Sequence, residues 1–268
     1  MWQVSSLGMD IAKMTEHTVM MTMPAWKWNE YGFCIKGFID NWPSDVNGIA
    51  LVQNPEDIPI KDIPDNLKIL DFDKFVGERL NGFQKRNQDR DMHNMGTTGN
   101  IAVQAYKFAH KALAQLYVLE NPPTRYVWYT DADLYTHKPV THELLDSLTS
   151  TEAYIGCTPR WWKPKGYTET GLMLWDTQSP HHKRWCELYA ECYDNDKIFE
   201  FDAWHDCIAF DYATKTVLSE GANLVDFGYG VRSSHPLVSG PLGAYFDHMK
   251  GQRKFVGHSR ERVRMHGK

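Results

Sequence analysis

Six short, strongly apolar runs alternate with longer segments of helical spacing, and this alternation constrains the fold more than any other feature of the sequence. The runs are almost continuously hydrophobic, which is typical of strands buried on both faces of a sheet. They are Thr18–Met23, Gly48–Val52, Leu67–Phe72, Tyr126–Thr130, Ala153–Cys157 and Gly171–Trp175. Strands and helices in alternation predict a three-layer α/β fold with a mostly parallel central sheet.

Four segments carry the apolar spacing of helices. They are Trp28–Asn41, Ile101–Leu119, His182–Tyr193 and Trp204–Tyr212. The second is the most regular, and Asn121-Pro122-Pro123 ends it because proline cannot continue a helix. Residues 77–100 are polar and rich in Gly and Asn, so we expect a long loop there, of a kind that usually has a function.

The composition favours one folded domain over residues 1–268. A hydrophobic content of 42% and an aromatic content of 13% supply a core and argue against disorder. The longest apolar stretch is too short to span a bilayer, and the N-terminus lacks the pattern of a secretory signal. The five cysteines form no Cys-x-x-Cys pair, so we expect free thiols and a cytoplasmic protein (host cytoplasm if viral). The net charge of −5 argues against a protein that coats nucleic acid.

The sharpest functional signal is a pair of aspartates directly after a buried strand. Asp131 and Asp133 follow Tyr126–Thr130 with only Ala132 between them. At the carboxyl end of a strand, both carboxylates can reach the crevice where open α/β sheets bind ligands. Their oxygens suit Mg²⁺ or Mn²⁺, which in turn holds a diphosphate. The tripeptide alone is equally typical of aspartates that cap a helix.

A second motif, His-x-x-Gly-x-x-Lys, stands near the C-terminus as His248, Gly251 and Lys254. It offers an imidazole for a metal, a glycine that lets the backbone approach phosphates, and a cation for their charge. It opens a segment, residues 250–268, that carries seven Lys and Arg against one acid. A solvated basic tail with an incidental histidine is the alternative interpretation.

Together the two motifs resemble those of the GT-A glycosyltransferases, in which a Rossmann-like domain ends its central strand in Asp-x-Asp. This resemblance implies that Asp131 and Asp133 bind a metal and the diphosphate of a nucleotide sugar. The second motif is similar to that of the glycogenin/galactosyltransferase branch. That similarity implies that His248 is a third metal ligand and that Gly251 and Lys254 contact the diphosphate.

The two residues after Lys254 are Phe255-Val256, where that branch has Pro-Trp, so retaining and inverting outcomes both stay open. The second half also resembles glycosyltransferases predicted in tailed phages and aquatic bacteria. Three short segments carry this resemblance, namely Phe108-Ala-His-Lys111, Glu169-Thr170-Gly171 and Trp204-His205-Asp206.

The predicted reaction moves a sugar from a nucleoside-diphosphate sugar, with UDP-sugar favoured, to an acceptor hydroxyl. Charge that develops on the diphosphate would be stabilised by the metal, by Lys254 and by Lys111, unless Lys111 merely faces solvent. An inverting enzyme also needs a carboxylate base. Asp206 is the candidate, because Trp-His-Asp resembles the x-Glu-Asp of inverting GT-A enzymes, with helix capping as the alternative. Glu169 either holds an acceptor hydroxyl or caps a turn.

We expect three functional parts along the chain. Residues 15–135 bind the nucleotide sugar, with Thr22 and Asp57 near its base and ribose. Residues 136–247 bind the acceptor, with Trp161-Trp162 on an acceptor loop, and residues 248–268 close over the diphosphate. The acceptor is open between a glycan, a modified base of phage DNA and a small molecule. An inactive sugar- or nucleotide-binding module and an Asp-x-Asp phosphatase are the alternative functions.

Overall fold

The computed structural model describes residues 16–90, 104–149, 152–164 and 166–267. Its seven-stranded central sheet has the order β3-β2-β1-β4-β7-β6-β8. The strands are β1 (His17–Pro24), β2 (Asn47–Gln53), β3 (Leu67–Asp71), β4 (Tyr126–Thr130), β6 (Ile155–Thr158), β7 (Glu169–Asp176) and β8 (Leu224–Asp226). Only the pairings of β7 with β4 and with β6 are antiparallel in this sheet. The predicted α/β fold with a mostly parallel sheet is confirmed.

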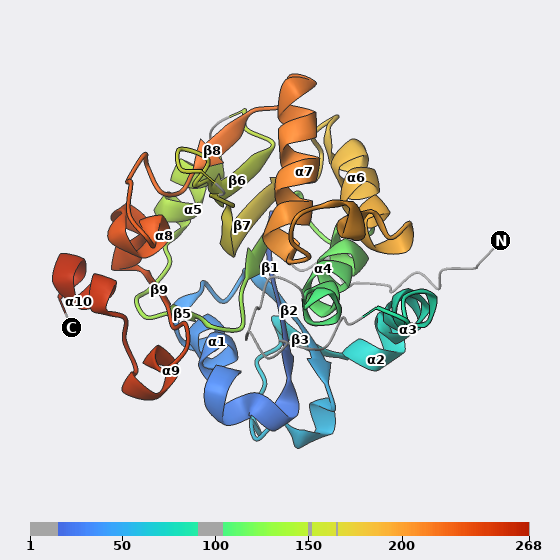
Figure 1. Ribbon diagram of the computed structural model, residues 1–268. Helices are drawn as coiled ribbons and strands as arrows, with labels where there is room; N and C mark the ends of the chain where they lie inside the picture. Colours follow the sequence, from blue (N-terminus) through green and yellow to red (C-terminus); the bar gives the residue numbers. More distant parts are fainter. Residues whose placement is uncertain (1–15, 91–103, 150–151, 165, 268) are drawn as a thin grey trace.

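Helices cover both faces of this sheet (Figure 1). One face is covered by α2 (Phe72–Phe75), α3 (Gly77–Arg86), α4 (Ala105–Leu119), α6 (His182–Asp194) and α7 (Asp206–Ser219). The other is covered by α1 (Trp28–Asn41), α5 (His142–Thr149) and α8 (Pro236–Ser239). The described ranges also contain short 3₁₀ helices, namely η1 (Ala25–Lys27), η2 (Pro55–Asp57), η4 (Lys197–Glu200) and η5 (Pro241–Ala244).

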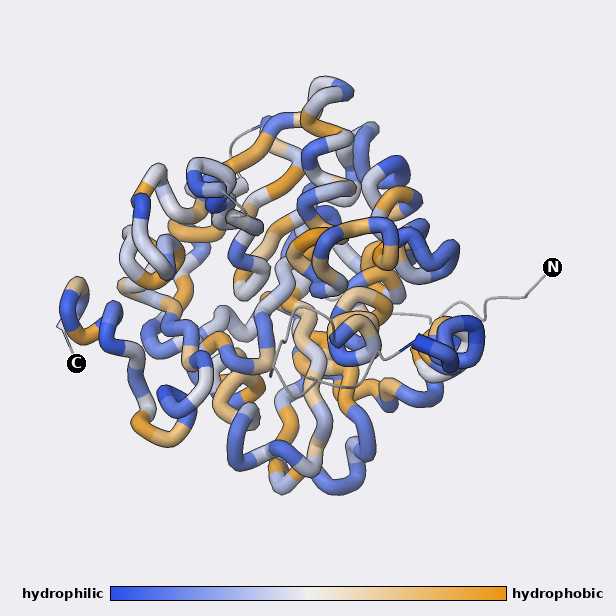
Figure 2. The backbone as a smooth tube through the Cα atoms, in the orientation of Figure 1, coloured by the Kyte–Doolittle hydropathy of each residue, from blue (hydrophilic) through white to orange (hydrophobic). Residues whose placement is uncertain are grey.

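The strands are apolar on both sides because each side faces a separate hydrophobic core. In β4, Val127 and Tyr129 point into one core, whereas Tyr126 and Trp128 point into the other. Successive residues of a strand face opposite sides of a sheet, so a strand between two cores has no polar face. Figure 2 shows the hydrophobic colour concentrated in the central strands and in the helices next to them.

A second sheet holds the C-terminal part of the chain against the turn after β4. It pairs β5 (Leu134–Thr136) with β9 (Phe246–His248) in antiparallel register. After β9 the chain continues through α9 (Arg253–Val256) and α10 (Arg260–His266). Strands of three residues carry no periodic signal, and the sequence analysis did not predict this sheet.

The prediction of a loop over residues 77–100 is wrong for its first part, because residues 77–86 form α3. Val76, Leu80 and Phe83 are buried at spacings of four and three residues, which gives this otherwise polar segment one apolar helical face. Residues 91–100 lie outside the described part of the chain.

Two predicted helices have different bounds. The segment expected at Trp204–Tyr212 begins at Asp206 and runs to Ser219. The one expected at Ile101–Leu119 is described from Gln104, with its helix beginning at Ala105. All five cysteines are free thiols. Among the described residues, no helix combines the length and apolar character needed to cross a bilayer.

We expect Leu80→Ala to lower the free energy of unfolding by about 2–5 kcal/mol, because it removes a buried side chain that anchors α3. Leu80 is 2% exposed, whereas Lys85 of the same helix is exposed and serves as the control. Denaturant unfolding should place Lys85→Ala within about 0.5 kcal/mol of the wild type. Equal effects of the two substitutions would contradict the packing of α3.

Candidate functional site

The aspartate pair lies on a tight turn at the carboxyl end of β4. The backbone N–H of Leu134 donates to the carbonyl of Asp131 at 2.8 Å, which closes the turn. The N–H of Asp131 donates to the carbonyl of Gly171 in β7, also at 2.8 Å. The turn is therefore anchored on the neighbouring strand, and both aspartates sit at the sheet edge where the sequence predicted them.

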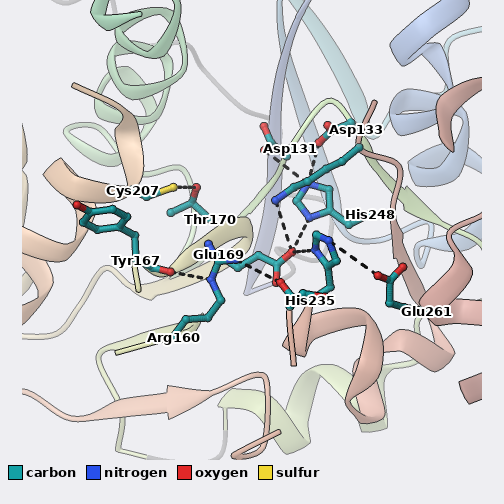
Figure 3. Close-up of polar contacts among 12 residues, drawn as sticks. Asp131, Asp133, Arg160, Tyr167, Glu169, Thr170, Cys207, His235, His248 and Glu261 are labelled. Carbon is teal, nitrogen blue, oxygen red and sulfur yellow. Dashed lines mark hydrogen bonds and ion pairs between the residues drawn. The ribbon is translucent and has the colours of Figure 1, made fainter. Parts of the chain in front are cut away.

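The small β5–β9 sheet brings His248 to this turn. Leu134 pairs with His248, and the N–H of Met249 donates to the carbonyl of Asp133 at 2.7 Å. The Nε2 atom of His248 lies 2.8 Å from Oδ1 of Asp133 and 4.0 Å from Oδ2 of Asp131. One ligand atom from each of the three residues lies within 4.8 Å of the others. The structure thus brings together the three predicted metal ligands (Figure 3).

Two carboxylates and one imidazole form a donor set that fits Mn²⁺ or Mg²⁺. Burial raises the pKa of the Asp133 carboxyl, but the neighbouring His248 outweighs this, and the pKa falls below its usual 3.8. Burial and Lys250 lower the pKa of His248, but Asp133 and Glu169 outweigh them and hold it above the usual 6.5. Asp131, Asp133 and His248 would hold such an ion, and phosphate oxygens or water would complete its ligands.

Glu169, a predicted catalytic residue, is the first residue of β7 and is buried beside the histidine. Its Oε1 atom lies 2.9 Å from Nδ1 of His248 and 3.4 Å from Nδ1 of His235. Burial raises the pKa of Glu169, but these two imidazoles outweigh it, and the pKa lies well below the usual 4.5. Nζ of Lys250 is 3.7 Å away. The carboxylate therefore stays ionised. It lies behind the cluster of Asp131, Asp133 and His248, which we call the metal-ligand cluster.

Lys111 does not face solvent but is buried beneath the first aspartate. Its Nζ atom lies 2.8 Å from Oδ2 of Asp206 and 3.3 Å from Oδ2 of Asp131. It also donates to the carbonyl oxygen and Oγ1 of Thr170, at 2.9 and 3.0 Å. Burial lowers the pKa of the ammonium group, but the two aspartates outweigh it and raise the pKa above 10.5. Lys111 thus joins the turn after β4 to the first residue of α7.

Asp206, the predicted base, is 3% exposed in this structure. Its Oδ2 atom accepts a hydrogen bond from Oγ1 of Thr170 at 2.7 Å, in addition to the contact with Lys111. Burial raises the pKa of Asp206, but Lys111 outweighs this effect and lowers it below 3.8. His205, Asp206 and Cys207 could also gather around a metal ion, but the ammonium group of Lys111 already occupies the carboxylate.

The other two residues of the His-x-x-Gly-x-x-Lys motif lie on the segment that follows β9. Gly251 has a φ of +61°, which glycine adopts without strain, and it allows the turn before α9. Lys254 lies 4.0 Å from Oε2 of Glu30 and 3.9 Å above the ring of Tyr31, both on α1. Its charge helps to lower the pKa of Asp133. The motif therefore adds positive charge near the cluster.

The residues predicted to read the donor base, Thr22 and Asp57, lie at the same sheet edge. Thr22 is half-buried near the end of β1, and Asp57 is exposed in η2, which follows β2. Within the described part of the chain, neither residue bonds to the metal-ligand cluster. Their roles stay predictions.

Sequence reasoning missed three residues that surround the aspartates and Glu169. The hydroxyl of Tyr129 donates to Oδ1 of Asp131 at 3.1 Å, Thr170 binds both Lys111 and Asp206, and His235 contacts Glu169. The sequence did point to Thr170, because it stands inside the Glu169-Thr170-Gly171 segment that carries the family resemblance. Tyr129 and His235 had none, because neither stands at a recognisable spacing from its partner.

We expect Lys111→Met to lower the free energy of unfolding by about 3 kcal/mol, because it leaves the buried carboxylate of Asp206 and the partly exposed one of Asp131 without their cation. The matched control is Lys107→Met, one turn earlier on α4 and exposed. Denaturant unfolding should also show that Asp206→Asn costs less in the Lys111→Met background than in the wild type. Additive losses would contradict the ion pair.

No protein-family model and no curated protein matches this sequence. Among solved structures, the bifunctional glycosyltransferase WbbM matches with a TM-score of 0.51 and 10% identity, over 81% of this chain and 39% of its own. The glycosyltransferase GlyE of Streptococcus pneumoniae TIGR4 matches with a TM-score of 0.45 and 14% identity, over 81% and 46% of the two chains.

The galactosyltransferase LgtC, solved with donor and acceptor sugar analogues, matches with a TM-score of 0.48 and 11% identity, over 82% and 81% of the two chains. The present chain spans less than half the length of the WbbM and GlyE chains that it matches. At 10% identity, the likeness to WbbM shows the fold alone. The chain has the α/β architecture of the GT-A glycosyltransferases.

Proposed function

We propose that this protein is a metal-dependent glycosyltransferase that moves a sugar from a nucleoside-diphosphate sugar, with UDP-sugar favoured, to an acceptor hydroxyl. The observation that carries the proposal is the cluster of Asp131, Asp133 and His248 at the carboxyl end of a central strand. The cluster lies on a fold shared with WbbM, a bifunctional glycosyltransferase. We expect residues 15–135 to bind the donor and residues 136–247 to bind the acceptor.

In the proposed reaction, the bond between the anomeric carbon and the diphosphate oxygen breaks, and its electron pair stays on the diphosphate. A bound Mn²⁺ or Mg²⁺ would supply positive charge against that oxygen. Lys254 and the turn at Gly251 would bind the phosphates directly. Lys111 lies behind Asp131 and would hold that carboxylate in place.

The acceptor oxygen bonds to the anomeric carbon and loses its proton to a base. Asp206 stays the predicted base, and its lowered pKa keeps it in the ionised form that a base requires. An acceptor would have to reach a carboxylate that Lys111 and Thr170 now cover. Glu169 is more deeply buried, at 1% exposed, which supports a role inside the protein over contact with an acceptor.

A cavity of about 620 Å³ beside α7 is our candidate acceptor site. Tyr167 lies on its wall two residues before Glu169, whereas the lining residues of α7, such as Ile208, lie on the face of that helix opposite Asp206. The cavity would therefore bind a part of the acceptor that is remote from the reacting hydroxyl. The remaining lining combines aromatic rings with carboxylates and hydroxyls, as in Phe201, Tyr212, Glu200, Asp202 and Thr216. Rings match the flat apolar faces of sugars and carboxylates bind their hydroxyls, so the lining supports a glycan acceptor.

The predicted acceptor loop borders this cavity. Trp161 donates its indole N–H to Asp211, which lines the cavity, at 3.0 Å. Lys215, another lining residue, lies over the Trp161 ring at 4.9 Å. Trp162 is 43% exposed and free to contact a bound sugar chain. The proximity supports the sequence prediction for this loop.

Part of the positive charge of the C-terminal segment is paired within the protein. Apart from Lys254, whose proposed role is at the donor phosphates, its internal ion pairs are Lys250–Glu169, Arg253–Glu261 and Arg262–Asp247. A charge that is paired internally is less available to phosphates of a duplex. This observation favours a glycan over a modified DNA base as the acceptor.

We expect one nucleoside diphosphate to raise the melting temperature of the wild type only when Mn²⁺ is present. A ligand at a hundredfold over its dissociation constant stabilises a protein by about 2.7 kcal/mol, and Asp133→Asn should abolish that gain. Asp40→Asn is the control, because Asp40 is an exposed carboxylate on α1. Thermal unfolding with a panel of nucleoside diphosphates, with Mn²⁺ and after chelation, makes the measurement.

A rise in melting temperature that does not depend on Mn²⁺ and is still present in Asp133→Asn would contradict the proposed site. Stabilisation without release of nucleoside diphosphate from any nucleotide sugar would favour the inactive binding module. No shift with any nucleotide would remove the donor site and favour the phosphatase.

A further inference from the structure

Glu169 touches the metal-ligand cluster only through His248. We propose that Glu169 is a positioning residue, which fixes the ring orientation and the tautomer of His248 so that Nε2 faces the metal. The inference rests on the metal site of the proposed function. It gives Glu169 a role different from the contact with an acceptor hydroxyl that the sequence predicted.

The first argument is the geometry of the two ring nitrogens. Nδ1 lies 2.9 Å from Oε1 of Glu169, and Nε2 lies 2.8 Å from Oδ1 of Asp133 (Figure 3). When Nδ1–H donates to Glu169, the lone pair available to a metal is on Nε2, the nitrogen that faces the two aspartates. A carboxylate behind a metal-ligating imidazole orients the ring and raises its basicity.

The second argument is the space that β7 leaves for the ring. Gly171 follows Glu169 by two residues, so both face the same side of the strand. A Cβ atom at position 171 would lie 2.7 Å from Cε1 and 2.9 Å from Nδ1 of His248. The imidazole therefore packs directly on the glycine. One strand supplies both the hydrogen-bond acceptor for the ring and the gap in which the ring lies.

The third argument is the unfavourable free energy of burying this carboxylate. Glu169 is 1% exposed, and its Oε2 atom has no hydrogen-bond partner within the described part of the chain. A buried ionised group destabilises the folded protein unless neighbouring charges and hydrogen bonds stabilise it. Those neighbours are the two imidazoles of His248 and His235 and the ammonium of Lys250. Packing alone would favour an apolar side chain here, so the carboxylate is explained by what it does to His248.

The test compares Glu169→Ala with Glu169→Gln in the full chain without nucleotide. The amide oxygen of Gln can still accept from Nδ1–H, whereas Ala cannot. We expect Glu169→Ala to weaken Mn²⁺ binding by about 10- to 100-fold, with most of the affinity restored in Glu169→Gln. Electron paramagnetic resonance of free Mn²⁺ measures the dissociation constant.

A second readout needs no metal. Nitrogen-15 chemical shifts of the His248 ring in the metal-free protein, recorded at a pH high enough for the ring to be neutral, report which nitrogen carries its single proton. We expect Nδ1 to stay protonated in the wild type and in Glu169→Gln, and to lose that preference in Glu169→Ala. If the wild type binds no Mn²⁺, the metal site fails, and these shifts still decide whether Glu169 sets the tautomer.

The matched control is Asp176→Asn at the other end of β7, about 23 Å away along the strand. Asp176 is paired with Arg125 at 3.0 Å, so its loss costs stability without touching His248. The dissociation constant of the Asp176→Asn variant for Mn²⁺ should equal that of the wild type. If Glu169→Ala does not fold, Gly171→Ala displaces the same ring and should weaken Mn²⁺ at least tenfold. Unchanged affinity and unchanged nitrogen shifts in the Glu169 variants would overturn the proposal.

Discussion

The site depends on the neutralisation of four carboxylates that converge between the ends of β4 and β7. They are Asp131, Asp133, Glu169 and Asp206. Like charges at this density repel each other strongly where water is excluded. Two buried basic side chains lie between these carboxylates, the ammonium group of Lys111 between Asp131 and Asp206 and the imidazole of His248 between Asp133 and Glu169. A divalent cation bound at the aspartate turn would add positive charge to the same site.

The sheet topology makes this convergence possible. Because β4 and β7 are antiparallel neighbours, the end of one lies beside the start of the other, and the aspartate turn meets Glu169 and Thr170. The β5–β9 pair then adds His248 from a sequence distance of 115 residues. A rigid sheet edge fixes all of these side chains on backbone hydrogen bonds. Geometry of this precision is what a metal site requires of its scaffold.

Sequence reasoning predicted the fold, and it named three residues, Asp131, Asp133 and His248, that the structure brings together, because both predictions rest on strong local signals. Long apolar strands are buried on both faces, and the two motifs combine metal-binding residue types at distinctive spacings. The buried state of Lys111 had no such signal, because its partners lie 20 residues or more away and a surface lysine looks the same in sequence. The strands β5 and β9, at three residues each, are too short for a hydrophobic pattern. The contact between Glu169 and His248 was not predicted, because His248 lies on β9.

The C-terminal segment contacts the site through Asp247, the residue next to His248. Asp247 accepts a hydrogen bond from the N–H of Ser259 at 2.7 Å and lies 3.9 Å from Arg262, both in the segment that follows β9. Because Asp247 and His248 are adjacent in β9, the contacts that hold this segment also fix the histidine. Metal binding at the proposed site would require His248 in place, so it would favour the folded segment, and the folded segment would favour metal binding. Residues 248–267 therefore belong to the site as part of its structure and not only as a source of positive charge.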